Sequence, residues 1–272
     1  MQVRSADLRR PDAVEAALPG ADAVVHLAAR VHVMREPAAD PLAEYRRVNT
    51  EATLELARAA RRRGVRRFVF MSTVKVNGER TIAGPFADRD AAAPADPYAV
   101  SKWEAEKGLR EIAGLEVICL RPPLVYGPGV KGNFLRLMRL VRLGVPLPLA
   151  SVANSRSMIY VGNLASAVER ALSGSAQGTF LVCDAADLST PQLVSMLAAA
   201  MGRRPRLVGV PPPLLRAAAR ALGRSDEVTR MLESLRLDCS GFKQQFQWVA
   251  PFTVEQGLKE TADWFERTRA AA

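Results

Sequence analysis

Apolar runs of strand length alternate with segments of helical periodicity along most of this chain, and this alternation constrains its fold more than any other feature. The apolar runs are of the kind that is buried on both faces of a sheet. They are residues 23–29, 67–72, 115–120 and 178–184, and the helical segments 42–62 and 98–112 lie between the first three. Strands and helices that alternate in this way form a parallel, doubly wound sheet. The sequence therefore predicts an α/β fold.

Beyond Gly129 the regular alternation ends, and the rest of the chain is mostly helical. A helix with a basic face is expected over 132–143, and a strand over 157–161 leads to a helix after Asn163. Further helices are expected at 189–201, 211–222, 225–235 and 254–267. Ser189 and Pro191 provide a hydroxyl cap and a first-turn proline for the first of them. We expect two parts with a shared interface, 1–130 together with 157–185, and 131–272.

The composition excludes several classes of function. With 272 residues, 49% of them hydrophobic, the chain can bury a sizeable core. The formal net charge is +10, but the arginines scatter over helical faces and no recognition motif is visible, so nucleic acid is not an expected partner. No apolar run approaches the length of a membrane span, and the N-terminus has no apolar signal-peptide core, so no membrane partner is expected.

The cysteine pattern indicates a reducing compartment. Cys119, Cys183 and Cys239 are far apart in sequence, and their spacing matches neither a disulfide framework nor a metal site. We therefore expect a cytoplasmic protein with free thiols and no metal.

Tyr98 and Lys102 are the residues with the clearest chemical meaning. If Pro97 opens a helix, the two side chains fall one turn apart on the same face. A phenol titrates near pH 10, and a neighbouring ammonium favours the phenolate and lowers that pKa. The pair is thus a candidate general acid and base, although a Tyr-x-x-x-Lys pair alone can arise by chance.

The surroundings of this pair resemble a known family. A strand ending in Met71-Ser72-Thr73 precedes the pair, and the segment from Leu120 to Gly129 follows it. Together these motifs resemble the extended short-chain dehydrogenase/reductase family of nucleotide-sugar epimerases, dehydratases and reductases, over nearly the whole chain. The resemblance implies an N-terminally truncated Rossmann-type sheet in 1–130 and a smaller, helical substrate-binding part in 131–272. It also implies NAD as cofactor, with NADP as the alternative, a UDP-sugar substrate, and a homodimer through helices 42–62 and 98–112.

The resemblance also assigns roles to residues. Tyr98 would exchange a proton with the sugar, Thr73 would hydrogen-bond the reacting oxygen, and Lys102 would also hold the nicotinamide ribose. The expected cofactor contacts are Asp7, Leu8, Leu27, Ala28, Ala29, Asn49, Met71, Ser72, Tyr98, Lys102 and Pro122, and the expected substrate contacts are Thr73, Lys75, Asn133 and Arg156. Asn133 and Arg156 would bind the diphosphate, for which a forked guanidinium is well suited.

Three further polar residues receive a structural interpretation. Asn49 is expected to be more structural than catalytic. His26 lies within an apolar strand and is expected to be a hydrogen-bonded core residue. His32 would lie near the nicotinamide without a catalytic role.

The residues after Thr73 discriminate among reactions. The sugar 4,6-dehydratases of this family carry an acidic pair there, because the elimination of water requires an additional acid and base. Here these positions are Val74 and Lys75, which disfavours dehydration. The remaining alternatives are a UDP-sugar 4-epimerase, an NAD(P)H-dependent reductase of a UDP-4-keto-6-deoxy sugar, and a non-catalytic relative that retains a UDP-sugar site.

The front of the chain lacks a feature that the family carries. A nucleotide-binding fold starts with a strand, a glycine-rich turn and a helix whose amides hold the pyrophosphate. The only early glycine is Gly20, in a loop, and the resemblance aligns the expected strand 2–8 with the family's third strand. We therefore expect the strand at 23–29 to be an apolar edge. We interpret the sequence as the later part of a longer gene product, with a shortened, inactive paralogue as the alternative.

Overall fold

The computed structural model describes residues 6–8, 10–18, 20–31, 40–223 and 225–270, and its centre is a parallel sheet. The strands are β1 (Ala23–His26), β2 (Arg67–Met71), β3 (Glu116–Arg121) and β6 (Gly178–Leu181), in the spatial order β1-β2-β3-β6. Phe68 pairs with Val24 on one side and with Val117 on the other, so the three apolar runs are in register. The predicted α/β fold is confirmed.

The start of the chain differs in part from expectation. Among the described residues β1 pairs only with β2 and forms one edge of the sheet, as expected. Residues 2–5 of the expected strand 2–8 lie outside the described residues, as does His32. Residues 6–8 form no strand, because a strand requires a hydrogen-bonded neighbour and β1 offers them no pairing here.

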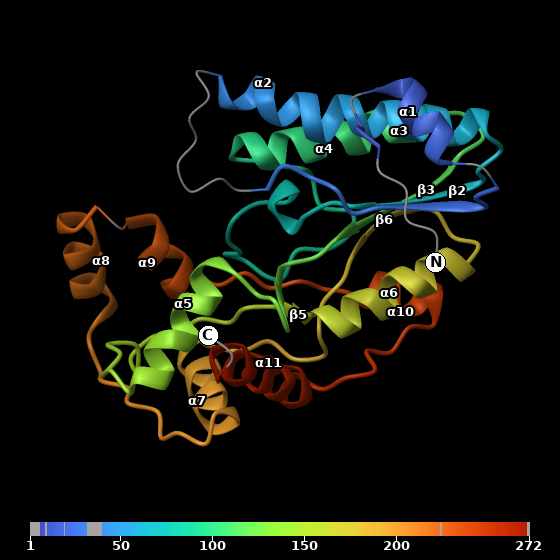
Figure 1. Cartoon of the computed structure of the whole chain (residues 1–272). Helices are drawn as coiled ribbons and strands as arrows, with labels where there is room; N and C mark the ends of the chain where they lie inside the picture. Colours follow the sequence, from blue (N-terminus) through green and yellow to red (C-terminus); the bar gives the residue numbers. More distant parts are fainter. Residues whose placement is uncertain (1–5, 9, 19, 32–39, 224, 271–272) are drawn as a thin grey trace.

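Helices cover both faces of the sheet (Figure 1). One face carries α1 (Pro11–Ala17), α2 (Pro41–Tyr45), the π-helix η1 (Arg46–Glu51), α3 (Ala52–Arg62) and α4 (Pro97–Arg110), and the other carries α6 (Val161–Ser173) and α10 (Ser240–Phe246). Phe68 and Phe70 of β2 pack into the core under the first set, whereas Val69 packs into the core with α6 and α10. This alternation follows from the two-residue period of a strand.

A second lobe lies beyond the carboxyl ends of the strands (Figure 1). It contains the short parallel pair β4 (Leu124–Tyr126) and β5 (Met158–Tyr160) with α5 (Gly132–Leu143), α7 (Thr190–Ala200), α8 (Pro212–Ala221), α9 (Ser225–Leu232) and α11 (Val254–Ala270). Its core joins Phe134 and Met138 of α5 to Leu197 of α7 and Leu258 of α11. None of the described helices is both long and apolar enough to cross a bilayer.

Several expected elements differ in their bounds. The helix expected over 42–62 is divided into α2, η1 and α3, and its middle turn is a π-helix. In this turn Thr53 Oγ1 donates to the backbone oxygen of Asn49 at 2.8 Å, which offers that carbonyl a side-chain partner. The last predicted strand ends at Leu181 instead of Asp184, and the helix expected over 225–235 ends at Leu232.

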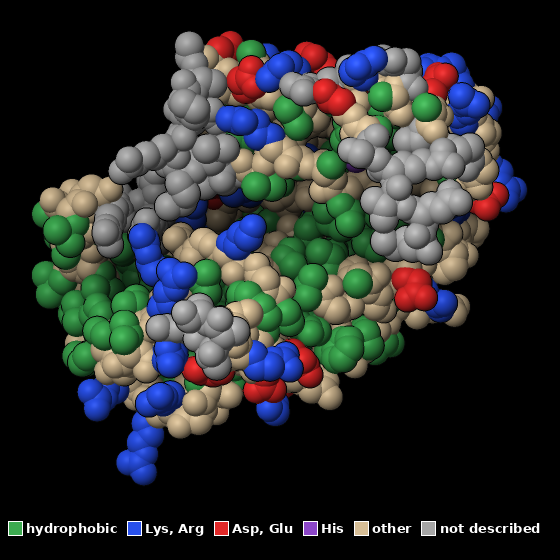
Figure 2. Space-filling model, viewed as in Figure 1, with side chains coloured by type: hydrophobic (Ala, Val, Ile, Leu, Met, Phe, Trp, Pro, Cys, Tyr) green, Lys and Arg blue, Asp and Glu red, His purple; other side chains and the backbone are tan. Residues whose placement is uncertain are grey.

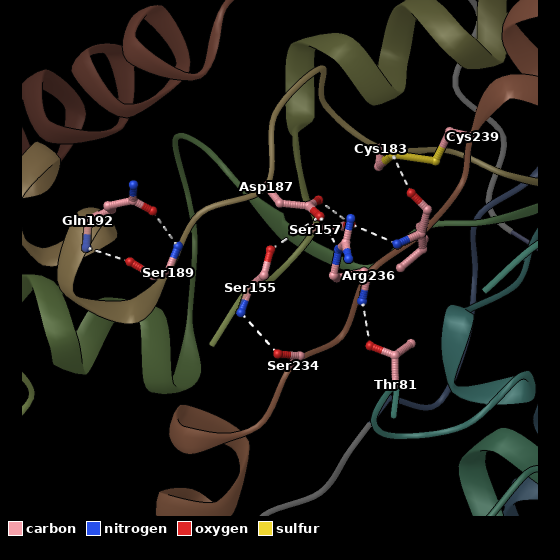
Figure 3. A network of polar contacts seen from close by, with 11 residues as sticks. Thr81, Ser155, Ser157, Cys183, Asp187, Ser189, Gln192, Ser234, Arg236 and Cys239 are labelled. Atoms are coloured by element: carbon pink, nitrogen blue, oxygen red, sulfur yellow. Dashed lines mark hydrogen bonds and ion pairs between the residues drawn. A yellow bond between two sulfur atoms is a disulfide. The ribbon is translucent and has the colours of Figure 1, made fainter. Parts of the chain in front are cut away.

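An extended segment, residues 233–239, joins the two lobes, and we call it the strap (Figure 3). On one side Ser157 N donates to Leu235 O at 2.8 Å. On the other side Phe86 N donates to Arg236 O at 2.8 Å, and Arg236 N donates to Thr81 Oγ1 at 3.1 Å. The strap therefore fixes the loop that follows Thr73 against the segment that carries Ser157.

A disulfide anchors the end of the strap, so the prediction of three free thiols is wrong. Cys183 and Cys239 are bonded, with their Cα atoms 6.2 Å apart, although 56 residues separate them in sequence. The fold brings them together because Cys183 follows β6 and Cys239 ends the strap. Cys119 is a buried free thiol.

Candidate active site

The sheet presents three strand ends at one edge, where doubly wound folds place their ligands. Leu27 to Ala29 follow β1, Ser72 and Thr73 follow β2, and Pro122 follows β3. Ser72 N donates to Leu120 O at 2.8 Å and Val74 N donates to Pro122 O at 3.0 Å, so the last two strand ends are held together. Leu27 is 61% exposed beside them. The structure thus brings these predicted cofactor contacts to one edge.

Helix α4 begins where the sequence predicts, because Asp96 and Pro97 form its N-terminus. Asp96 Oδ1 accepts from Ala99 N at 2.7 Å, and Pro97 occupies the first helical position, where no amide donor is required. Tyr98 follows directly, and its ring contacts the Tyr45 ring edge-on at a centroid distance of 6.1 Å.

Burial raises the pKa of Tyr98 to about 12, with smaller contributions from Asp96 and Tyr45. The expectation that Lys102 lowers the pKa of this phenol is therefore wrong for the protein without ligand. The physical reason is that desolvation and the negative charge of Asp96 both disfavour the phenolate. At neutral pH Tyr98 is a phenol that can donate a proton.

Lys102 lies one turn after Tyr98 and is almost completely buried, with 1% exposure. Its Nζ donates to the carbonyl oxygen of Met71 at 2.8 Å and lies 4.4 Å from the centre of the Phe70 ring. Burial lowers the pKa of Lys102 to about 8. The ammonium thus joins α4 to the end of β2, directly before Ser72 and Thr73.

Thr73 is nearly buried at the end of β2 and begins the short 3₁₀-helix Val74–Val76. Its Oγ1 accepts from Lys75 N at 3.3 Å, which orients the hydroxyl at the strand end. The Lys75 ammonium bonds to Asp96 and, at 2.9 Å, to Glu79. Lys75, which we expect to contact the substrate, thereby ties the loop after Thr73 to the N-terminus of α4.

A buried charge cluster beneath this edge was not predicted. Glu106 is fully buried and receives two hydrogen bonds from the Arg121 guanidinium, at 2.9 and 2.6 Å, and one from Ser72 Oγ at 2.5 Å. Arg121 also donates to Asn77 Oδ1 at 3.0 Å. One feature of the sequence could have indicated this cluster. Glu106 follows Lys102 by four residues and therefore shares its helix face.

Asn49 and His26 occupy the interior, as expected. Asn49 is fully buried, and its Nδ2 donates to Ser101 Oγ at 3.0 Å and to Arg30 O at 3.0 Å. His26 Nε2 lies 2.9 Å from Thr53 Oγ1. Burial, with a smaller contribution from Lys102, lowers the pKa of His26 to about 4, so this ring is neutral at pH 7. Both residues stabilise the packing of the η1 and α3 region on the sheet.

Asp7 and Leu8, two of the predicted cofactor contacts, lie just before α1 in the chain. They line a cavity of 440 Å³ together with Arg47, Glu51, Ala52 and Glu55. This cavity lies along η1 and α3, and its polar walls combine both signs of charge.

The candidate diphosphate residues lie in the second lobe. Arg156 Nη1 donates to the carbonyl oxygens of Arg230 and Glu233 at 2.7 and 2.9 Å. Burial lowers the pKa of Arg156, with a smaller contribution from the positive charge of Arg230 and an opposing one from Glu233. Asn133 is exposed at the start of α5. Arg230 was not predicted, because 74 residues separate it from Arg156.

This combination of a parallel sheet, a Tyr-x-x-x-Lys helix and a hydroxyl at the neighbouring strand end is that of a Rossmann-type short-chain oxidoreductase. The profile of the NAD dependent epimerase/dehydratase family matches residues 2–183. The chain is also 42% identical over 266 residues to the UDP-glucose 4-epimerase of Vibrio cholerae, a match that covers 95% of this chain and 81% of that protein. The chain therefore belongs to the NAD dependent epimerase/dehydratase family.

Other relatives differ in the substrates that their names state. The N-acetyl-alpha-D-glucosaminyl-diphospho-ditrans,octacis-undecaprenol 4-epimerase of Escherichia coli O157:H7 is 27% identical over 95% of this chain and 82% of that protein. Among solved structures, RMD from Pseudomonas aeruginosa complexed with NADPH superimposes with a TM-score of 0.78 at 25% identity, covering 97% of this chain and 88% of the other. The UDP-glucose 4-epimerase of Thermotoga maritima with UDP-glucose has the same fold, with a TM-score of 0.74 at 22% identity, covering 96% and 83% of the two chains.

Proposed function

We propose that this protein is an NAD-dependent UDP-sugar 4-epimerase, which removes a hydride from C4 of the sugar and returns it to the opposite face. The observation that carries the proposal is the hydrogen bond from Lys102 Nζ to the carbonyl of Met71. It fixes the helix of Tyr98 against the strand end that carries Thr73. A proton donor and a second hydroxyl would then flank the position of the sugar oxygen.

The cofactor contacts that we propose are residues at the strand ends and the buried ammonium of Lys102. Leu27, Ala28 and Ala29 lie after β1, and Ser72 and Pro122 lie after β2 and β3, next to Lys102. A cation in this position suits the ribose hydroxyls of a nicotinamide nucleotide. When bound there, NAD would accept the C4 hydride and give it back.

The chain's own residues would supply the proton chemistry. Thr73 Oγ1 would hold the C4 oxygen, and Tyr98 would take the proton of the C4 hydroxyl as the hydride leaves and return it later. Because burial holds the pKa of Tyr98 at about 12 in the free protein, the proton acceptor would form only when a positive charge lies near the phenol. Lys102, with its pKa of about 8, is largely protonated at pH 7 and would contribute part of that charge.

The second lobe would bind the diphosphate of the substrate. The positive charge of Arg230 contributes to the lowered pKa of Arg156, and a diphosphate beside Arg156 would relieve this repulsion. Asn133, at the start of α5, would add an amide at the edge of this site. Of the substrates that the relatives' names state, UDP-glucose belongs to the relative with 42% identity, and we propose a UDP-sugar of this kind.

A reductase of a UDP-4-keto-6-deoxy sugar is the second candidate. It uses the same residues, and the similarity at 25% identity to a structure complexed with NADPH favours it. The absence of acidic side chains at Val74 and Lys75 still disfavours dehydration.

The test is an NMR assay of the purified protein with NAD and UDP-glucose or UDP-N-acetylglucosamine. We expect the 4-epimer to accumulate without net reduction of the cofactor. Tyr98→Phe should lower kcat about 10²- to 10⁴-fold, the usual contribution of a general acid or base. The matched control is Tyr160→Phe, since Tyr160 packs in the second lobe against Tyr126 and Phe252, away from the strand ends.

Three results would contradict the proposal. Oxidation of NADPH with a 4-keto sugar and no epimer would indicate the reductase. An equal effect of the two tyrosine changes would remove the role of Tyr98. Binding of UDP without any turnover would indicate a non-catalytic relative.

A further inference from the structure

Two long stretches of the chain contain no acidic residue. Residues 117–168 and 188–225 lack aspartate and glutamate, and each contains six lysines or arginines. These twelve cations exceed the formal net charge of +10 of the whole chain. Both stretches belong largely to the second lobe, where they form α5, α7, α8 and the loops between them. The positive charge of the protein is therefore concentrated there.

Helix α8 exposes its apolar side chains instead of burying them. Leu214 is 61% exposed and Leu222, directly after the helix, is 73% exposed. Ala217, Ala218 and Ala221 are exposed as well, whereas only Ala219 of this helix is buried. Leu214, Ala217, Ala218 and Ala221 follow the spacing of one helix face. Arg216 and Arg220, four residues apart, share a different side of the helix and are also exposed.

The surface next to α8 has the same character. Val208 is 49% exposed on the segment that leads into α8. This segment pairs with the loop after α5, where Val208 N donates to Leu147 O at 2.8 Å. The same loop exposes Leu143 by 70% and Val145 by 42%. We define the α8 face as Leu143, Val145, Val208, Leu214 and Leu222 with Arg203, Arg204, Arg206, Arg216 and Arg220.

Figure 2 shows how this surface is composed. Hydrophobic side chains gather over α8 and the segments beneath it, at the left of the view, with Lys and Arg side chains beside them. Exposed apolar groups of this number rarely lie together on a soluble protein without a partner. The arginines determine what kind of partner fits, because a strongly positive rim favours an anionic surface.

We propose that the α8 face binds the surface of an anionic lipid bilayer. An amphipathic helix with exposed leucines and flanking arginines lies in the membrane interface, with its leucines among the acyl chains and its guanidinium groups at the phosphates. Such attachment requires no spanning segment. This inference does not rest on the proposed catalytic function, because none of the face's residues is assigned to the active site.

The position of α8 would bring an attached bilayer close to part of the proposed substrate site. Helix α8 packs on α9. The backbone carbonyl of Arg230, in α9, accepts a hydrogen bond from Arg156. A bilayer at the α8 face would therefore border the proposed diphosphate site. A glycosyl diphosphate present at that surface would reach Arg156 without crossing the protein.

The test is co-sedimentation of the full chain with phosphatidylcholine vesicles, with and without phosphatidylglycerol. We expect binding to the anionic vesicles and little binding to the neutral ones. Arg216→Gln with Arg220→Gln should weaken binding about 20- to 30-fold, since each basic residue near the surface contributes about fivefold. Leu214→Gln with Leu222→Gln should weaken binding at both low and high salt.

A matched control distinguishes the effect of the α8 face on vesicle binding from the effect of the protein's net charge. Arg63→Gln with Arg66→Gln removes the same two charges from exposed positions near β2, on the other lobe. We expect this variant to bind anionic vesicles nearly as well as the unchanged protein. Thermal unfolding of all three variants verifies that they fold, and turnover of a soluble UDP-sugar should be unchanged in them.

Four outcomes would overturn the proposal. They are no binding to anionic vesicles, equal binding to neutral vesicles, an equal loss in the control variant, and a change of oligomeric state in the leucine variant without vesicle binding. The last result would show that a second copy of the chain covers the α8 face.

Discussion

Lys102 is a charged residue of this site that the fold removes from water. The side chain is buried beside the Phe70 ring, with the Met71 carbonyl as its acceptor. The pKa of about 8 means that the protein destabilises the charged form relative to water. Such residues are retained where the charge is used, which is why perturbed groups mark candidate functional sites.

The lowered pKa of Lys102 predicts how the stability difference between the wild type and Lys102→Met changes with pH. Between pH 8 and pH 10.5 the unfolded chain binds a proton at Lys102 that the folded protein has lost, so stability from this group rises with pH. Relative to Lys102→Met, the wild type should therefore gain about 3 kcal/mol of unfolding free energy from pH 7 to above pH 10. Urea unfolding of both proteins at the two pH values measures this gain. A constant difference between the two proteins would contradict the pKa assignment.

At the residue scale, the sequence predicted the position of the candidate residues better than their environment. Tyr98, Lys102 and Thr73 are marked by a short motif and by strand ends, and the fold brings them to one edge. The pKa of Tyr98 could not be predicted from spacing, because it depends on burial and on Asp96 and Tyr45. Lys75 is bonded to Asp96 and Glu79, and no pattern within the sequence indicated that pairing.

At the element scale, α4 is the part that organises the site. Its outer face carries Glu104, which forms an exposed ion pair with Arg46. Its inner face carries Glu106, which joins Arg121 at the end of β3 and Ser72 at the end of β2. One helix thus fixes two strand ends through a single buried carboxylate.

Glutamines at these two positions of α4 should therefore have very different effects. Glu106→Gln leaves the Arg121 charge buried and unpaired, and should lower the unfolding free energy by about 3–5 kcal/mol. Glu104→Gln removes a partly exposed pair and should cost less than about 1 kcal/mol. Urea unfolding of the two variants provides the comparison. Similar values for the two would show that the buried cluster contributes no more than a surface pair.

The elements themselves were largely predictable, since burial on both faces gives the strands a simple pattern. The exception is the segment expected as one helix, which contains the π-helix η1. Asn49 in this π-helix bonds to Arg30 and Ser101 from other parts of the chain. Periodicity within the segment carries no record of these contacts.

At the scale of the whole molecule, the strap and its disulfide connect the two lobes. The strap bonds to residues on both sides of the interface, and Cys239 fixes its end to Cys183 after β6 (Figure 3). The spacing of the cysteines could not reveal this pair. Their proximity follows only from the order of the strands and the return of the chain across the interface.

Reduction of this disulfide should therefore destabilise the protein. The two cysteines are 56 positions apart, and a loop of this length predicts a loss of roughly 4 kcal/mol in the chain-entropy view. Thermal unfolding with and without a reductant measures the loss, and a Cys183→Ser, Cys239→Ser variant should be insensitive to the reductant. An unchanged transition in the reduced wild type would contradict the role of the bridge.

In the proposed reaction, a hydride leaves C4 of a UDP-sugar and returns to the same carbon. The most direct test is turnover of UDP-glucose that carries deuterium at C4, with NAD present, followed by NMR and mass analysis of the product. We predict that the 4-epimer forms and keeps its deuterium at C4. Loss of the label to the solvent or to a released cofactor, or the absence of any epimer, would contradict the account.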